Sequence, residues 1–211
     1  MPTIDHFFYS QPMKGVYPSG DGWFTAEDDC RYRFTAIDSI GHGLEAYAVT
    51  LRLIERMKWI VQRSTRMPEL PELISELHHD LCDVKNINTQ AAITVVDLDK
   101  TSNTIQSVAI GNVSCSLITQ NKTTAINSCS GMVGGRIPAS ININKICVED
   151  DFMIVFTTDG LSHGEVMTYL QERIDMNNLD PKIEVTKIVS QFSGLYDDSS
   201  CGIVRVFSHA C

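Results

Sequence analysis

Aspartates at the ends of short apolar segments are the residues of this chain best suited to chemistry. They lie in Ser19-Gly20-Asp21-Gly22, Asp38-Ser39-Ile40-Gly41-His42-Gly43, Thr158-Asp159-Gly160-Leu161 and Asp197-Asp198. Aspartate is unfavourable in strands and costly to bury unpaired, so several aspartates that converge indicate divalent cations, with Mg²⁺ or Mn²⁺ suited to oxygen ligands. Two such ions can bridge a hydroxide and orient a phosphate for attack. These motifs therefore predict a metal centre for phosphate-ester hydrolysis.

Each motif also has a plain structural interpretation. Ser-Gly-Asp-Gly around Asp21 is an ordinary turn sequence, Asp38 could cap the helix after it, and Asp159 could be a turn residue after a strand. His42 could protonate a leaving group, but its place at a helix start favours a supporting role. His78-His79 lie together on a predicted helix, without the clustered ligands that a zinc site needs.

Apolar periodicity indicates the elements that would position these aspartates. Residues 33–38 form a predicted strand that ends at Asp38, and the Gly-rich turn after it opens a helix. A second helix begins near Pro68 or Pro71. The predicted stripe of the first helix is Leu44, Ala48, Leu51, Ile54, Met57 and Val61, and that of the second is Leu70, Leu73, Ile74, Leu77, Leu81 and Val84.

Short strands make up most of the remaining chain. They are predicted at 91–97, 104–110, 113–119 and 123–128, with connections too short for helical crossovers, so the pairing should be antiparallel. Residues 143–148 and 152–158 are predicted as a further hairpin that leads to Asp159. Helices at 164–176 and 182–195 precede a last strand at 202–207, and the stripe of the second is Val185, Ile188, Val189, Phe192 and Leu195.

Two pairs of adjacent helices indicate two sheets that pack face to face with helices outside. The predicted fold class is therefore α+β, a four-layer α/β/β/α sandwich of two antiparallel sheets flanked by helix pairs. Residues 1–32 look rich in turns. At 211 residues and 43% hydrophobic composition, the chain fits one domain, 1–211.

Composition also excludes several classes of protein. The formal net charge of -9 and the lack of a basic run argue against a nucleic-acid binder. No apolar stretch is long enough to span a bilayer and the N-terminus does not resemble a signal peptide, so we expect a soluble, cytoplasmic protein without a membrane partner. Seven scattered cysteines indicate reduced thiols.

Taken in order, these motifs resemble the type 2C metal-dependent serine/threonine phosphatases, in the bacterial branch that includes SpoIIE, RsbU and RsbX. The resemblance covers nearly the whole chain and also rests on Ala109-Ile110-Gly111-Asn112-Val113. About 20 residues precede the first motif, so the chain is most similar to the RsbX type, without a separate regulatory domain.

The resemblance implies a role for each aspartate. Asp38 would bridge two ions, with Asp21 and the Ser39 carbonyl completing the shell of one and Asp159 and Asp197 holding the other. Asp198 would share the ligand role or support it. Asp21 and Asp38 are thus the expected catalytic residues.

Phosphate contacts are less clearly indicated than metal ligands. Eukaryotic members place an Arg upstream of the first acid, and the corresponding stretch here offers Lys14. The Gly-rich segment 131–136 lacks the Lys and Ser/Thr of a P-loop, but its Arg136 could contact substrate. Lys14 and Arg136 are therefore the candidate substrate-binding residues.

The leading hypothesis is a Mn²⁺- or Mg²⁺-dependent phosphoserine/phosphothreonine phosphatase in which metal-bound hydroxide attacks the phosphate. Its substrate would be a bacterial stress-signalling phosphoprotein, such as a stressosome component or an anti-sigma antagonist. The alternative is a catalytically weak binding module in the same kind of complex, because a fold alone does not guarantee activity. A histidine-kinase-like ATPase is disfavoured, since residues 1–32 look too short and turn-rich for its upstream Asn-bearing helix.

Overall fold

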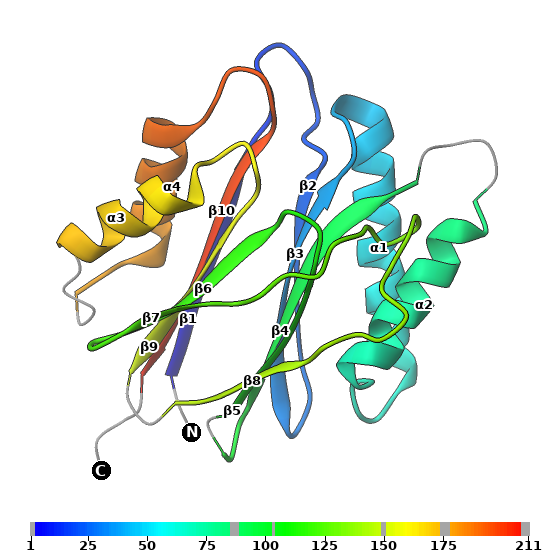
Figure 1. The fold of residues 1–211 in the computed structure, drawn as a ribbon, viewed down its shortest axis with the longest axis horizontal. Helices are drawn as coiled ribbons and strands as arrows, with labels where there is room; N and C mark the ends of the chain where they lie inside the picture. The colour runs from blue at the N-terminus through cyan, green and yellow to red at the C-terminus, as the bar shows by residue number, and fades with distance from the viewer. Residues whose placement is uncertain (1–2, 85–88, 103, 149–150, 174–177, 208–211) are drawn as a thin grey trace.

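Two five-stranded antiparallel sheets pack face to face in the computed structural model, which describes residues 3–84, 89–102, 104–148, 151–173 and 178–207. Figure 1 shows helices on both outer faces. The first sheet has the order β1 (Thr3–Gln11), β10 (Ser199–Phe207), β9 (Phe152–Thr157), β6 (Ser114–Thr119) and β7 (Thr123–Ala125). The second has the order β2 (Asp21–Glu27), β3 (Arg31–Ser39), β4 (Ala91–Asp99), β5 (Thr104–Ile110) and β8 (Asn144–Cys147).

Helix pairs complete the four layers. The helices α1 (Gly43–Arg63) and α2 (Leu70–Cys82) cover the second sheet, and α3 (His163–Arg173) and α4 (Pro181–Phe192) cover the first (Figure 1). Three apolar clusters result, one between the sheets and one under each helix pair. The predicted α/β/β/α sandwich of antiparallel sheets is confirmed. None of the described helices is both long and apolar enough to cross a membrane.

Strand alternation decides which side chains face the space between the sheets. On β3, Phe34 and Ala36 belong to the core between the sheets, whereas Ile37 packs under α1 and α2. On β2, Trp23 likewise faces the other sheet and Phe24 faces the helices. Because side chains alternate along a strand, aspartates two residues from Ala36 and from Trp23 share the face between the sheets.

The first predicted helix is present, but its apolar stripe was only partly right: Met57 is buried and Ile54 and Val61 are half-buried, whereas the other three members are exposed. Leu44 is 72% exposed and Leu51 is 42% exposed. The buried face comprises Gly43, Ala46, Val49, Thr50, Leu53, Met57 and Ile60. This face includes small and polar residues because β2 approaches α1 very closely: a Cβ on Gly22 would lie 2.2 Å from Thr50 Cγ2. The stripe of α2 is confirmed from Leu70 to Leu81.

Several strand predictions also need correction. The turn-rich prediction for residues 1–32 missed both β1 and β2. The predicted hairpin at 143–158 does not form, because β8 pairs with β5 in one sheet and β9 pairs with β10 and β6 in the other. The strand predicted at 123–128 is shorter, and α4 ends at Phe192, which leaves Leu195 62% exposed. Residues 174–176 of the predicted third helix lie outside the described residues.

Candidate metal centre

Asp21 and Asp38 lie side by side at one end of the sandwich. They are paired across β2 and β3, and both face the space between the sheets. Directly opposed residues on antiparallel strands have Cβ atoms about 4.5–5.5 Å apart. Two carboxylates that sequence analysis placed in separate motifs are therefore immediate neighbours.

Hydroxyl groups from the opposite sheet hold the Asp21 carboxylate in place. Its Oδ2 accepts hydrogen bonds from Thr158 Oγ1 at 2.8 Å and from Ser200 Oγ at 2.5 Å. The Thr158 hydroxyl also accepts a bond of 3.0 Å from the Ser200 backbone N–H. Sequence analysis did not identify either hydroxyl, because each gains its role only when β9 and β10 pack over β2.

The carboxyl group of Asp38 is in an unfavourable environment for a charged group. Its Oδ2 is buried without a hydrogen-bond partner among the described residues. Burial raises the pKa of Asp38 to about 9, and repulsion from Asp21, Asp159 and Asp197 adds to the shift. Burial likewise raises the pKa of Asp21 to about 7, against the opposing effect of its two hydroxyl partners. Both groups therefore favour a bound proton or cation at neutral pH.

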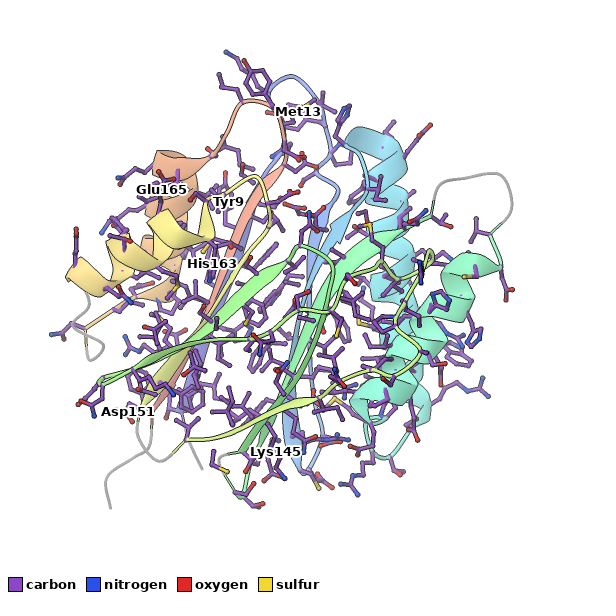
Figure 2. All side chains as sticks on the ribbon, in the orientation of Figure 1. Tyr9, Met13, Lys145, Asp151, His163 and Glu165 are labelled. Carbon is purple, nitrogen blue, oxygen red and sulfur yellow. The ribbon has the colours of Figure 1, made fainter. Side chains whose placement is uncertain are left out.

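Asp159 is exposed and follows β9 at the same end of the sandwich. Its Oδ2 accepts a 2.5 Å hydrogen bond from Asn112 Nδ2 in the turn between β5 and β6. His163 lies at the start of α3 (Figure 2). Its two ring nitrogens lie 2.8 Å from the hydroxyls of Thr157 and Ser116, so it joins the end of β9 to β6. Sequence analysis named Asn112 only as part of a motif, without a contact to Asp159, and gave His163 no role.

Asp197 and Asp198 are adjacent in the chain but differ in their surroundings. Asp198 is buried, and its two carboxylate oxygens accept hydrogen bonds from the backbone N–H groups of Met13 at 2.7 Å and Gly20 at 2.6 Å. Asp197 is exposed, and burial and nearby carboxylates raise its pKa. Asp198 thus fixes the β1–β2 loop, whereas Asp197 can reach an ion.

Ser39 and His42 border the carboxylates on the side of α1. Ser39 is buried, and its Oγ lies 2.7 Å from Thr50 Oγ1, while its backbone carbonyl approaches Gly20. His42 is exposed at the N-terminal cap of α1 and is close enough to Asp197 to lower the pKa of that carboxyl. Ser39 therefore joins the end of β3 to the helix that follows it.

Lys14 and Arg136, the predicted substrate-binding residues, are both exposed. Lys14 lies in the β1–β2 loop next to Met13, and Arg136 lies in the segment after Gly131. Within the described residues, neither forms an ion pair with the site aspartates. The structure therefore brings together the five aspartates and Ser39, and the substrate-binding roles of Lys14 and Arg136 stay predictions.

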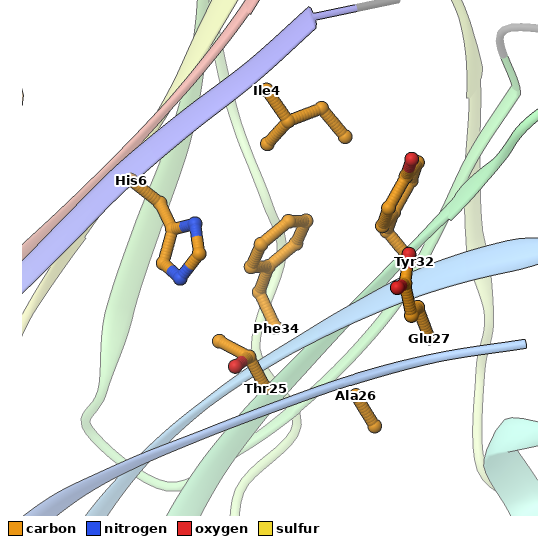
Figure 3. A pocket seen from close by; sticks show the side chains of 7 residues that line it. All are labelled: Ile4, His6, Thr25, Ala26, Glu27, Tyr32 and Phe34. Carbon is orange, nitrogen blue, oxygen red and sulfur yellow. The ribbon is translucent and has the colours of Figure 1, made fainter. Parts of the chain in front are cut away.

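A pocket of about 370 Å³ opens elsewhere, between β1 and the β2–β3 hairpin (Figure 3). Its lining includes Ile4, His6, Tyr32 and Phe34, and His6 packs edge-on against Phe34. None of the site aspartates lines it. The carboxylate cluster is therefore a feature of the end of the sandwich, separate from this pocket.

The donor set fits hard divalent cations, which prefer carboxylate and carbonyl oxygens. The raised pKa values of Asp21 and Asp38 and the unpartnered Asp38 Oδ2 indicate charge that a cation would neutralise. Among the described residues, no three acidic, His or Cys side chains already converge at ligand distance. Ion binding would therefore have to draw the carboxylates closer together.

The sequence matches a known protein family. The family model described as stage II sporulation protein E (SpoIIE) matches residues 28–205. No curated protein matches the chain.

Solved structures share the fold at low sequence identity. A structure from work on the bacterial stressosome has a TM-score of 0.82 at 18% identity, covering 96% of this chain and 100% of the other. RsbX in complex with magnesium has a TM-score of 0.76 at 16% identity, covering 96% and 95%. The PP2C phosphatase domain of SpoIIE from Bacillus subtilis, with a regulatory fragment, has a TM-score of 0.82 at 13% identity, covering 100% and 65%. The chain belongs to the SpoIIE family, and it shares the fold of the RsbX and SpoIIE phosphatase-domain structures.

Proposed function

We propose that the chain is a Mn²⁺- or Mg²⁺-dependent phosphoserine/phosphothreonine protein phosphatase. The observation that carries the proposal is the meeting of Asp21 and Asp38 from one sheet with Asp159, Asp197 and Asp198 from the other. Five carboxylates at one end of a sandwich, with no ion pair to Lys or Arg among the described residues, are suited to divalent ions.

Each residue has a distinct part in this proposal. Asp38 would hold both ions, Asp21 and the Ser39 carbonyl would hold one, and Asp159 and Asp197 would hold the other. When bound, the ions supply positive charge to the phosphate and activate water for attack. Thr158 and Ser200 orient Asp21 through its Oδ2, and Asn112 orients Asp159. Asp198 positions the β1–β2 loop instead of binding an ion directly.

The proposed substrate is a phosphorylated protein of a bacterial stress-signalling pathway, either a stressosome component or an anti-sigma antagonist. Support comes from the structures similar to this chain, which include RsbX and a structure from work on the stressosome. We further propose a cytoplasmic location, and a single phosphatase domain over residues 1–211. Lys14 and Arg136 stay candidates for transient contacts with the substrate, since both are exposed.

Phosphate release from p-nitrophenyl phosphate and from a phosphoserine protein tests the proposal. Wild type should turn over with Mn²⁺ or Mg²⁺ and not with chelator, and Asp38→Ala should lower kcat at least about a thousandfold. Asp80→Ala is the matched control, because Asp80 is a half-buried aspartate of α2 that pairs with Arg52 of α1 and is not among the site aspartates. A folded wild-type protein without turnover in either ion would favour the binding module instead.

A further inference from the structure

The most exposed large apolar side chains of the described residues gather at the end of the molecule that carries the aspartates. They are Tyr196 at 90%, Tyr17 at 75%, Leu44 at 72% and Leu195 at 62% exposed. The next in exposure, Ile183 at 51%, lies in the first turn of α4, distant from its end near the site. Contiguous exposed apolar surface marks an interaction site more often than scattered residues do.

These four side chains, here called the apolar rim, belong to the same three segments that position the site. Tyr17 lies in the β1–β2 loop, which Asp198 anchors through Met13 and Gly20. Leu195 and Tyr196 directly precede Asp197. Figure 1 shows the β1–β2 loop, the α4–β10 loop and the start of α1 at the same end of the sandwich.

The β1–β2 loop also packs against the start of α1. A Cβ on Gly43 would lie 3.0 Å from Val16 Cγ1, so the loop that carries Tyr17 contacts the first turn that carries Leu44. Because Leu195 and Tyr196 directly precede Asp197, a protein that brings a phosphate to the site would lie next to this rim. Small phosphate esters would not need to contact it.

Charge cannot replace apolar contact at this rim. The chain carries a formal net charge of -9, and Asp159 and Asp197 are exposed at the site. Lys14 and His42 are the basic side chains in the three segments, 12–20, 40–44 and 193–196, all of which the structure describes. An acidic stretch next to the phosphoresidue would therefore be repelled, and a basic stretch would compete with the ions for the carboxylates.

We propose that the apolar rim docks the protein substrate by binding large apolar residues that flank its phosphoserine or phosphothreonine. This inference rests on the proposed phosphate site, and it defines the partner as a phosphoprotein that displays the phosphoresidue within an apolar surface. Tyrosine offers a large apolar area with a polar tip and is enriched among the anchor residues of protein interfaces.

Two fluorescent peptides test this preference by anisotropy in the presence of Mn²⁺. Both carry a non-hydrolysable phosphonate in place of phosphoserine, one flanked by Leu and Phe and the other by Ser and Asn. Wild type should bind the apolar peptide at least about tenfold more tightly. Tyr17→Ser and Leu195→Ser should each reduce that ratio, whereas Ile183→Ser, the matched exposed control on α4, should keep it.

Equal affinities for the two peptides, or tighter binding of the polar one, would overturn the inference. Self-association through the rim would also overturn it. The result would be a dimer in sedimentation that Tyr17→Ser dissociates, together with equal binding of the two peptides. Hydrolysis of p-nitrophenyl phosphate is measured separately. If p-nitrophenyl phosphate is not hydrolysed but the peptide preference persists, the proposed phosphatase activity is wrong and the docking surface stands. Failure of the proposed function is therefore distinguishable from failure of this inference.

Discussion

At the scale of single residues, Asp197 and Asp198 show how neighbouring carboxylates acquire different tasks. Alternation along the chain turns Asp198 toward the space between the sheets, where it accepts two backbone N–H groups. Asp197 stays exposed next to the other carboxylates. A buried carboxylate with both oxygens hydrogen-bonded stabilises a loop, whereas an exposed one is free to bind an ion.

Asp198→Ala should therefore lower the free energy of unfolding by about 2–4 kcal/mol, because it leaves the N–H groups of Met13 and Gly20 without their acceptor. Asp197→Ala should change it by less than about 1 kcal/mol, since its side chain is exposed. Urea denaturation of the metal-free variants gives both values. Equal losses would contradict the assignment of Asp198 as the anchor.

The five aspartates and Ser39 could be predicted from sequence because each stands in a motif at the end of an apolar segment. The contacts that support these residues could not be predicted from sequence. Thr158, Ser200 and Asn112 bond to aspartates that lie between 47 and 179 positions away in the chain. Their roles depend on strand packing, which no local pattern of hydroxyl or amide residues indicates.

At the scale of elements, the site depends on how closely β2 packs against α1. A Cβ on Gly20 would lie 2.6 Å from Ala46 Cβ, and one on Gly22 would lie 2.2 Å from Thr50 Cγ2. Thr50 in turn donates a hydrogen bond to the Gly20 carbonyl and contacts Ser39. The helix thus fixes the strand ends that carry Asp21 and Asp38.

Gly22→Ala should force α1 away from β2 and lower the free energy of unfolding by about 1–3 kcal/mol. It should also weaken Mn²⁺ binding, because Asp21 is the adjacent residue. Gly164→Ala is the control: nothing lies within 4 Å of the added Cβ, and alanine favours the helix, so stability should rise by up to about 1 kcal/mol. If Gly22→Ala leaves the free energy of unfolding unchanged, the contact between β2 and α1 is not tight.

The same close packing explains which elements could be predicted. The helix α2 has a regular stripe from Leu70 to Leu81 and was predicted correctly. The stripe of α1 was partly misplaced because its contact face uses Ala46 and Thr50. The strands β1 and β2 were missed, since both are edge strands and β2 begins at a sequence, Ser-Gly-Asp-Gly, that also favours a turn.

At the scale of the whole molecule, the carboxylate cluster links stability to pH. The pKa values of Asp21, about 7, and of Asp38, about 9, lie above the ordinary value of 3.8, so the folded protein binds protons more tightly than the unfolded chain. The stability that these protons contribute is fully present below the ordinary pKa and is lost as pH rises from there through the folded pKa values. Bound cations would replace the protons.

The metal-free protein should accordingly lose stability between about pH 4 and pH 9, from the ordinary pKa of 3.8 up to the raised pKa of Asp38. Urea denaturation in chelator at several pH values measures this. Asp38→Asn should make the decline shallower, because the amide cannot ionise. Saturating Mn²⁺ should stabilise wild type most at the alkaline end. A free energy of unfolding that rises with pH in chelator would contradict the account.

Titration calorimetry of Mn²⁺ binding at about pH 7 tests the central claim most directly, because it reports on the ions and on the carboxylates together. Repeating it in two buffers of different ionisation enthalpy gives the number of protons released. Wild type should bind Mn²⁺ and release about one proton or more, since Asp38, with a pKa of about 9, is protonated before binding. Asp38→Asn should bind at least about 100-fold more weakly. Absence of Mn²⁺ binding by folded wild type, or equal affinity in Asp38→Asn, would contradict a metal centre built on these aspartates.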